Sequence, residues 1–161
     1  MCGIVGYVGG REALPILLGG LERLEYRGYD SCGVALAGSS GLGVWKTTGR
    51  VTNLRESIQA LVDTVGIGHT RWATHGAPTE ANAHPHTDAA KRVAVAHNGI
   101  IENHDSIRGW LGKEGIPFTS ETDTEALAQL IGWLYHGDLE AAVRSALHEV
   151  EGAYGLVVVC A

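Results

Sequence analysis

The chain has 161 residues, 45% of them hydrophobic and 19% charged, a composition typical of one globular domain. The net charge of −6 argues against a general binder of nucleic-acid phosphates. No apolar run approaches the roughly 20 residues of a membrane-spanning helix, no signal peptide is recognisable, and three cysteines without zinc-site spacing fit a reducing compartment. We therefore expect a cytoplasmic protein with no nucleic-acid or membrane partner.

Strands and helices follow one another irregularly along the chain. The periodicity of apolar residues predicts strands over 1–8, 32–37, 43–47, 66–71, 92–97 and 153–161. It predicts helices over 11–26, from about 53, over 105–112, from 122 and from 138. The turn at 38–41 joins two strands into a hairpin. This mixture favours layered α+β architecture over a doubly wound parallel sheet.

Helix caps, one long polar stretch and the last apolar run lead to further predictions. Asn53 begins one sequence with the spacing of a capping box, Thr122 begins another, and Asp138 is a candidate cap for the last helix. The polar stretch 72–90 is too long for an ordinary connection and is therefore expected to be functional or mobile. The run 153–161 is apolar on both faces, so we expect an interior strand and a chain cut from a longer protein.

Cys2 is the reactive side chain at the start of the first strand. If the initiator methionine is removed, this residue carries both a thiol and a free α-amine. An α-amine with a pKa of about 8 can act as a base at neutral pH, and a cysteine thiolate is a strong nucleophile. Such a residue needs no separate histidine. On position and residue type alone, a small buried residue at a strand start is the simpler interpretation.

Polar segments at strand ends and helix starts each allow a structural and a functional interpretation. Arg71 beside Trp72 can bind a carboxylate, although a surface arginine over a packed tryptophan is the more common case. Asn98 and Gly99 can direct two N–H donors at an oxyanion, although the dipeptide alone indicates a turn. Asp123 can receive an ammonium group or simply stabilise a helix start.

The histidines between residues 84 and 104 invite a metal hypothesis. Their spacing matches no zinc signature, and Pro85 between His84 and His86 prevents both from being presented by one helix. The glycines near the N-terminus form no dinucleotide-binding fingerprint. We therefore expect neither a metal nor a cofactor.

Seven segments in order resemble one enzyme family. They are Met-Cys-Gly-Ile-Val-Gly at 1–6, Arg-Leu-Glu-Tyr-Arg-Gly-Tyr-Asp-Ser at 23–31, His-Thr-Arg-Trp-Ala-Thr-His-Gly at 69–76, Asn-Ala-His-Pro-His at 82–86, His-Asn-Gly-Ile-Ile-Glu-Asn at 97–103, Ser-Glu-Thr-Asp-Thr-Glu at 120–125 and Gly-Ala-Tyr-Gly at 152–155. Along essentially its whole length the chain is similar to the N-terminal glutaminase domain of the glutamine–fructose-6-phosphate amidotransferase family, the glucosamine-6-phosphate synthases. These enzymes are class II glutamine amidotransferases.

The resemblance implies an N-terminal-nucleophile (Ntn) hydrolase fold, a four-layer α/β/β/α sandwich whose C-terminal part is missing here. It implies hydrolysis of L-glutamine to glutamate and ammonia through a γ-glutamyl thioester. Cys2 would be the nucleophile, with its own α-amine relaying the proton. Asn98 and Gly99 would form the oxyanion hole. Independently of the family, a zwitterionic amide substrate requires a cation, an anion and a nucleophile, and the chain supplies one of each.

The resemblance also implies substrate contacts. Arg71 would bind the α-carboxylate, assisted by the loop that carries Trp72, Thr74 and His75, and Asp123 would bind the α-ammonium. The residues expected to support the site are Arg27, His84 and His86.

The family assignment implies one incomplete domain over 1–161. The sugar-phosphate isomerase domain would be absent, so fructose 6-phosphate would bind only through that missing part, and the full-length enzyme would be a homo-oligomer. Two alternatives stay open. The chain could be a catalytically silent glutamine-binding fragment, because of the missing segment or a retained Met1. It could also hydrolyse another amide, although such substrates would not need both Arg71 and Asp123.

Overall fold

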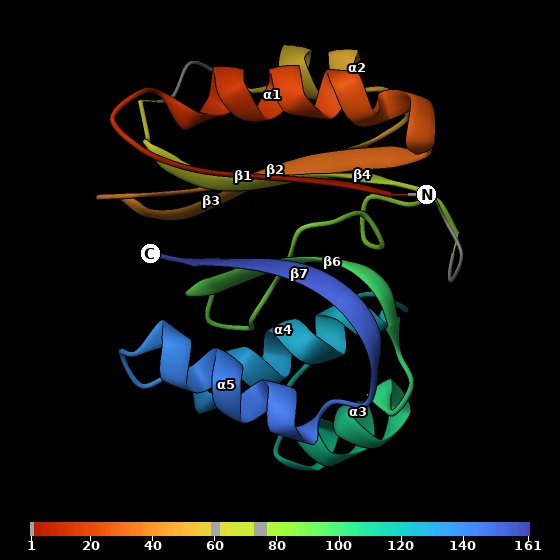
Figure 1. Cartoon of the computed structure of the whole chain (residues 1–161). Coiled ribbons are helices and arrows are strands. Elements are labelled where there is room, and N and C mark those ends of the chain that lie inside the picture. Colours follow the sequence, from red (N-terminus) through yellow and green to blue (C-terminus); the bar gives the residue numbers. More distant parts are fainter. Residues whose placement is uncertain (1, 59–61, 73–76) are drawn as a thin grey trace.

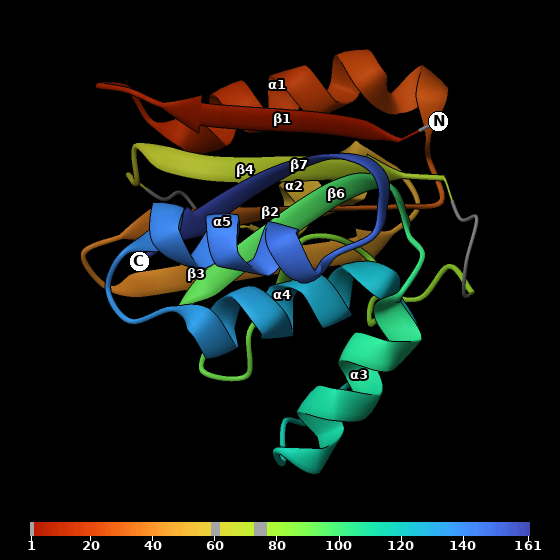
Figure 2. The same ribbon diagram turned by 60° about the horizontal axis from the view of Figure 1, so that its bottom comes forward.

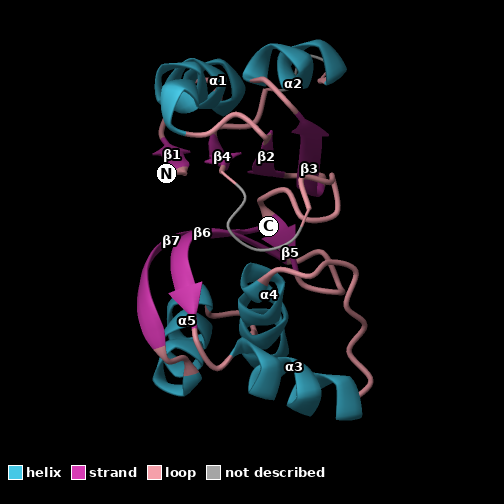
Figure 3. Cartoon of the chain, turned by 90° about the vertical axis from the view of Figure 1, so that its right-hand side faces the viewer, coloured by secondary structure: helices cyan, strands magenta, loops and turns pink. Residues whose placement is uncertain are grey.

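The computed structural model describes residues 2–58, 62–72 and 77–161, which form four layers in the order helices, sheet, sheet, helices (Figure 1). Figure 3 shows the two sheets face to face between the two helical layers. This arrangement confirms the expected α+β sandwich. None of the helices in the described ranges is long and apolar enough to cross a membrane.

The first sheet is antiparallel, with strand order β1-β4-β2-β3. Its strands are β1 (Gly3–Val8), β2 (Ser31–Gly38), β3 (Gly41–Thr48) and β4 (Val65–Arg71). Helices α1 (Ala13–Leu24) and α2 (Val51–Ser57) cover its outer face, and the short 3-10 helix η1 (Glu25–Arg27) follows α1 (Figure 1). Leu14, Leu17, Leu18 and Leu21 of α1 are buried against the sheet because they recur every three or four residues.

The second sheet is antiparallel, with strand order β5-β6-β7. Its strands are β5 (His86–Thr87), β6 (Val93–Ile101) and β7 (Gly152–Cys160). The helices of its outer layer are α3 (His104–Lys113), α4 (Asp123–Leu134) and α5 (Leu139–Glu149). Figure 2 shows α4 and α5 lying across the strands and α3 projecting away from them. The apolar face of α4 forms the centre of this half of the core.

Alanines make up much of the packing between the two sheets. Ala35 and Ile67 of the first sheet pack there against Ala94, Ala96 and Val159 of the second. Because alanine side chains are short, the two backbones come close in this region, and polar side chains from one sheet can reach the other. The candidate site depends on that close approach.

The start of α2 differs from the prediction. The helix begins at Val51 rather than after a cap at Asn53, and the Val51 backbone N–H donates to Glu25 Oε1 at 2.7 Å. A carboxylate from a distant part of the chain thus satisfies this helix end, which local spacing cannot reveal. The predicted caps Thr122 and Asp138 are confirmed by side-chain hydrogen bonds to the backbone of α4 and α5.

Two strands also differ from the prediction. Asn98 and Gly99 do not form a turn but continue β6, where they pair with Gly155 and Tyr154 of β7. Strand β7 was expected inside a sheet, yet among the described strands it pairs with β6 alone and lies at an edge. The short strand β5 lies within the long polar stretch and was not predicted. In each case the pairing depends on partners distant in sequence.

Candidate active site

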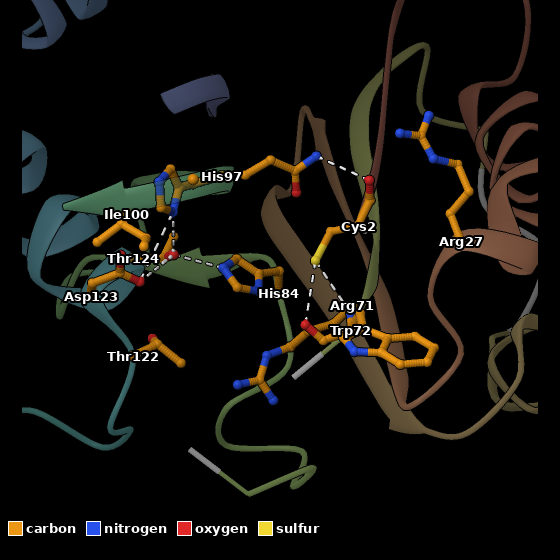
Figure 4. A pocket seen from close by; sticks show the side chains of 12 residues that line it. Cys2, Arg27, Arg71, Trp72, His84, His97, Ile100, Thr122, Asp123 and Thr124 are labelled. Atoms are coloured by element: carbon orange, nitrogen blue, oxygen red, sulfur yellow. Dashed lines mark hydrogen bonds and ion pairs between the residues drawn. The ribbon is translucent and has the colours of Figure 1, made fainter. Parts of the chain in front are cut away.

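A cavity of about 430 Å³ brings most of the predicted site residues together (Figure 4). Its lining consists of Cys2, Arg27, Arg71, Trp72, His84, His97, Asn98, Gly99, Ile100, Thr122, Asp123 and Thr124. Such a volume suits a small-molecule ligand. The predicted residues Thr74 and His75 lie outside the described residues. Among the described ones, His86 alone does not line this cavity and lines a neighbouring one of about 510 Å³ instead.

The pairing of β1 with β4 places Cys2 beside the end of β4. These strands are antiparallel with Gly3 opposite Thr70, so the residue before β1 meets the residues that leave β4. The Trp72 backbone N–H donates to Cys2 Sγ at 3.2 Å. The Cys2 thiol also lies 3.6 Å from the Trp72 carbonyl oxygen, to which it can donate, so the backbone of Trp72 fixes the position of the sulfur.

Cys32 has a different environment. It is buried, and burial together with the negative charge of Glu25 raises the pKa of its thiol to about 12. This thiol therefore stays protonated at neutral pH and is a poor nucleophile. Of these two cysteines, Cys2 is the one that faces the cavity.

Asn98 connects the two sheets. From β6 its side-chain Nδ2 donates to the Cys2 backbone carbonyl oxygen at 3.3 Å, and its Oδ1 lies 2.9 Å from His69 Nε2 on β4. An amide NH2 has two hydrogens, so Asn98 can donate one to Cys2 and the other to a substrate oxygen.

Gly99 occupies a position that requires glycine. Its φ of +131° lies in the region that side chains disfavour. A Cβ at this position would collide with the Ala153 carbonyl oxygen of β7. The turn predicted from this dipeptide is thus wrong, because the structure has a strand position that only glycine suits.

Asp123 is the first residue of α4 and is held by two hydrogen bonds. The Ile101 backbone N–H donates to Oδ2 at 2.9 Å, and the Thr124 hydroxyl donates to Oδ1 at 3.4 Å. The side chain is 18% exposed, so the carboxylate is largely desolvated and still borders the cavity. Figure 4 shows Asp123 and Cys2 on opposite sides of the cavity, an arrangement that suits a ligand with an amine at one end and a reactive group at the other.

Thr124 gathers two buried histidines behind Asp123. His84 Nε2 and His97 Nδ1 lie 2.7 and 2.9 Å from Thr124 Oγ1 (Figure 4). The hydroxyl has one proton for three partners, because Asp123 Oδ1 also lies 3.4 Å from it, so at least one of the two histidines must donate to Thr124.

Burial keeps these histidines neutral. It lowers the pKa of His84 well below the usual range, helped by the positive charge that the neighbouring histidines and Arg71 can carry. Burial also lowers the pKa of His97, although the charge of Asp123 opposes the shift. The site wall behind Asp123 is thus polar and uncharged at neutral pH.

The cationic residues differ in position. Arg71 is buried at the end of β4, and its Nη1 donates to the Ala77 carbonyl oxygen at 3.3 Å. Arg27 lines the cavity from η1, and in Figure 4 it lies on the opposite side of Cys2 from Asp123. Arg71 is therefore the better placed of the two to meet a carboxylate inside the cavity.

Sequence reasoning missed part of the site. His69 and Thr124 were given no role, and His97 was considered only as a possible metal ligand. A histidine between glycine and threonine in a buried strand is a weak signal, and its hydrogen-bond partner lies on another strand. Among the described residues, no group of three or more histidine, cysteine or acidic side chains is arranged to hold a metal ion.

The four-layer sandwich with a cysteine at the start of its first strand is the Ntn-hydrolase fold. The structure of the glutamine phosphoribosylpyrophosphate amidotransferase from B. subtilis, complexed with ADP and GMP, is similar with a TM-score of 0.83 and 28% identity. That match covers 99% of this chain and 35% of the other. A structure described as the allosteric regulatory enzyme of purine biosynthesis has a TM-score of 0.84, also at 28% identity, with the same coverage.

Residues 69–160 match the family model of the glutamine amidotransferase domain, and the chain belongs to this family. The chain is 56% identical, over 99% of its length, to the isomerizing glutamine–fructose-6-phosphate aminotransferase of Symbiobacterium thermophilum. The enzymes of the same name from Clostridium tetani and from a strain of Thermus thermophilus are 52% and 55% identical over 99% and 98% of this chain. The chain spans only 26–27% of the length of these relatives.

Proposed function

We propose that this chain hydrolyses L-glutamine to glutamate and ammonia, with Cys2 as an N-terminal nucleophile after removal of Met1. The observation that carries this proposal is that Cys2, Asn98 and Asp123 line a single cavity, with Arg71 beside them. A glutamine molecule has an amide at one end and a zwitterion at the other. The cavity offers a thiol and amide donors for the first, and an anion and a cation for the second.

In the first half-reaction the Cys2 thiolate attacks the side-chain carbonyl carbon of glutamine. A carbon–sulfur bond forms, and the carbonyl electrons move onto oxygen, where Asn98 Nδ2 and the Gly99 backbone N–H would stabilise them. The α-amine of Cys2 takes the thiol proton and returns it to the leaving nitrogen. The carbon–nitrogen bond then breaks, ammonia leaves, and a γ-glutamyl thioester remains.

In the second half-reaction water attacks the thioester carbon. The same α-amine accepts a proton from the water, and the same donors stabilise the second oxyanion. The carbon–sulfur bond then breaks, and the amine returns the proton to the departing sulfur. Glutamate and the Cys2 thiol are the products. Throughout, Asp123 would hold the α-ammonium and Arg71 the α-carboxylate, so recognition groups stay fixed while the reacting end changes.

The whole protein's role is a broader proposal that follows from the relatives' names. In a chain of their length, we propose that the ammonia is transferred to fructose 6-phosphate to form glucosamine 6-phosphate. The sugar phosphate would be bound by an isomerase domain outside residues 1–161, in a cytoplasmic homo-oligomer. The present chain would supply the ammonia.

The test is intact mass spectrometry with the glutamine analogue 6-diazo-5-oxo-L-norleucine. We expect a starting mass without methionine and one adduct per chain, located on Cys2. Cys2→Ala should remain unlabelled, whereas the matched control Cys160→Ala should be labelled like the wild-type chain. Glutamate release from L-glutamine should follow the same order. A processed chain that neither takes up the label nor releases glutamate would refute the proposal.

A further inference from the structure

His69 lies behind the candidate oxyanion hole without lining the cavity. It is fully buried in β4, two residues before Arg71. Side chains alternate along a strand, and Ile67, two residues earlier, packs between the two sheets. His69 therefore also faces the second sheet, where its Nε2 lies 2.9 Å from Asn98 Oδ1.

We infer that His69 is a positioning residue, which holds the Asn98 side-chain amide with its NH2 group directed at the reacting carbonyl oxygen. This inference rests on the proposed function, because an oxyanion hole has meaning only for attack on a carbonyl group. His69 does not line the cavity and would act entirely through Asn98.

The hydrogen-bond partners on both sides of Asn98 determine how its amide is oriented. The Cys2 carbonyl oxygen can only accept, so the group that faces it at 3.3 Å must be the Asn98 NH2. The amide oxygen then faces His69, and His69 must donate to it through Nε2–H. This reasoning requires the Nε2-protonated form of the imidazole and a fixed amide plane.

The surroundings of His69 favour a neutral donor. Burial lowers the pKa of His69 to about 4, despite the hydrogen bond to Asn98, which raises it. The ring of His84 lies against it, with centroids 4.3 Å apart and planes at 34°. His69 thus donates to Asn98 without placing a positive charge beside the Cys2 amine, which must lose a proton to act as a base.

Loss of the His69 hydrogen bond should affect kcat more than substrate binding. The Asn98 donor acts on charge that develops in the transition state, so a misplaced amide lowers kcat more than it weakens ground-state binding. Loss of one oxyanion donor lowers kcat by about 10²–10³-fold. A donor that is present but poorly oriented should therefore give a kcat at least about tenfold below that of a well-oriented donor.

The experiment compares His69→Leu, which cannot donate, with His69→Gln, whose side-chain NH2 can replace the Nε2–H. We expect His69→Leu to lower kcat for glutamine hydrolysis at least about tenfold, with KM changed less than about threefold. His69→Gln should recover most of that loss. His148→Leu, at an exposed position on α5, should match the wild-type chain.

A double-mutant cycle with Asn98→Ala separates positioning from a general structural effect. If His69 acts through Asn98, adding His69→Leu to Asn98→Ala should lower kcat little further. Equal losses of kcat with and without Asn98 would overturn the inference, as would a His69→Leu chain with the wild-type kcat or a His69→Gln chain no better than His69→Leu. A wild-type chain that releases no glutamate would instead overturn the proposed function, and this inference with it.

Discussion

Acidification should destabilise the chain through its buried histidines. The folded-state pKa of His69 is about 4, whereas a histidine in the unfolded chain titrates near 6.5. Between these values the unfolded state binds a proton that folded His69 does not. The free energy of unfolding therefore falls as the pH drops below 6.5, and the contribution of His69 levels off below pH 4.

The magnitude follows from the width of that window. One group that is protonated only in the unfolded state changes stability by about 1.4 kcal/mol per pH unit. Between pH 7 and pH 5, His69 alone should therefore cost about 2 kcal/mol of stability. Burial and neighbouring positive charges also hold the pKa values of His84 and His86 well below the usual range, so they add losses of the same sign.

Urea unfolding at pH 7 and pH 5, followed by circular dichroism, measures this effect. The pH-dependent loss should be about 2 kcal/mol smaller in His69→Gln than in the wild-type chain, because glutamine does not titrate. The exposed control His148→Gln should show the wild-type loss. An identical loss in wild type and His69→Gln would refute the reasoning.

Three further predictions concern the proposed ammonium contact of Asp123, the Gly99 position in β6 and the start of α2. Asp123→Ala should raise KM for L-glutamine by at least about tenfold, because an ammonium loses its charged partner; an unchanged KM in steady-state kinetics would exclude this contact. Gly99→Ala should lower the free energy of unfolding by about 1–3 kcal/mol in urea titrations, since its Cβ would collide with the Ala153 carbonyl oxygen at a positive φ; wild-type stability would contradict the steric argument. Glu25→Ala should lower the free energy of unfolding by about 1 kcal/mol, because it removes the acceptor of the Val51 N–H at the start of α2. An unchanged free energy of unfolding in the same titration would show that water replaces the carboxylate.

Local patterns predicted the elements whose stability is largely local. The leucine spacing of α1 and the cap at Thr122 each depend on residues within a few positions, and both are confirmed. The start of α2 and the continuation of β6 through Asn98 depend on Glu25 and on β7, so the same methods gave the wrong result. In both cases the sequence pattern could not show which distant residue or strand supplies the hydrogen bonds.

The candidate site likewise combines residues that the sequence motifs indicate with contacts between distant segments. The ordered motifs indicated Cys2, Asn98 and Asp123, and the structure brings these residues to one cavity. The groups that hold them in place were not predictable, because the His69–Asn98 and Thr124–His97 contacts join segments 29 and 27 positions apart. Residue types that do chemistry are recognisable in a sequence, whereas their supporting hydrogen bonds require the fold.

The site is built from both sheets, so the spacing between the sheets should control its activity. Cys2 directly precedes β1 of the first sheet and Asn98 belongs to the second, and the 3.3 Å contact between them joins the two halves. Ala96 packs in that interface on the same side of β6 as Asn98, whereas Val95 packs on the helical side.

Ala96→Val adds volume between the sheets and should cost about 1–3 kcal/mol of stability, while Val95→Ala leaves a cavity on the other face at a similar cost. Of the two variants, only Ala96→Val should move Asn98 away from Cys2, because only Ala96 lies between the sheets. We therefore expect its kcat, measured where both variants are fully folded, to fall about tenfold below that of Val95→Ala, because small displacements of catalytic groups are costly. Equal kcat values would show that the sheet spacing does not set the geometry of the proposed oxyanion hole.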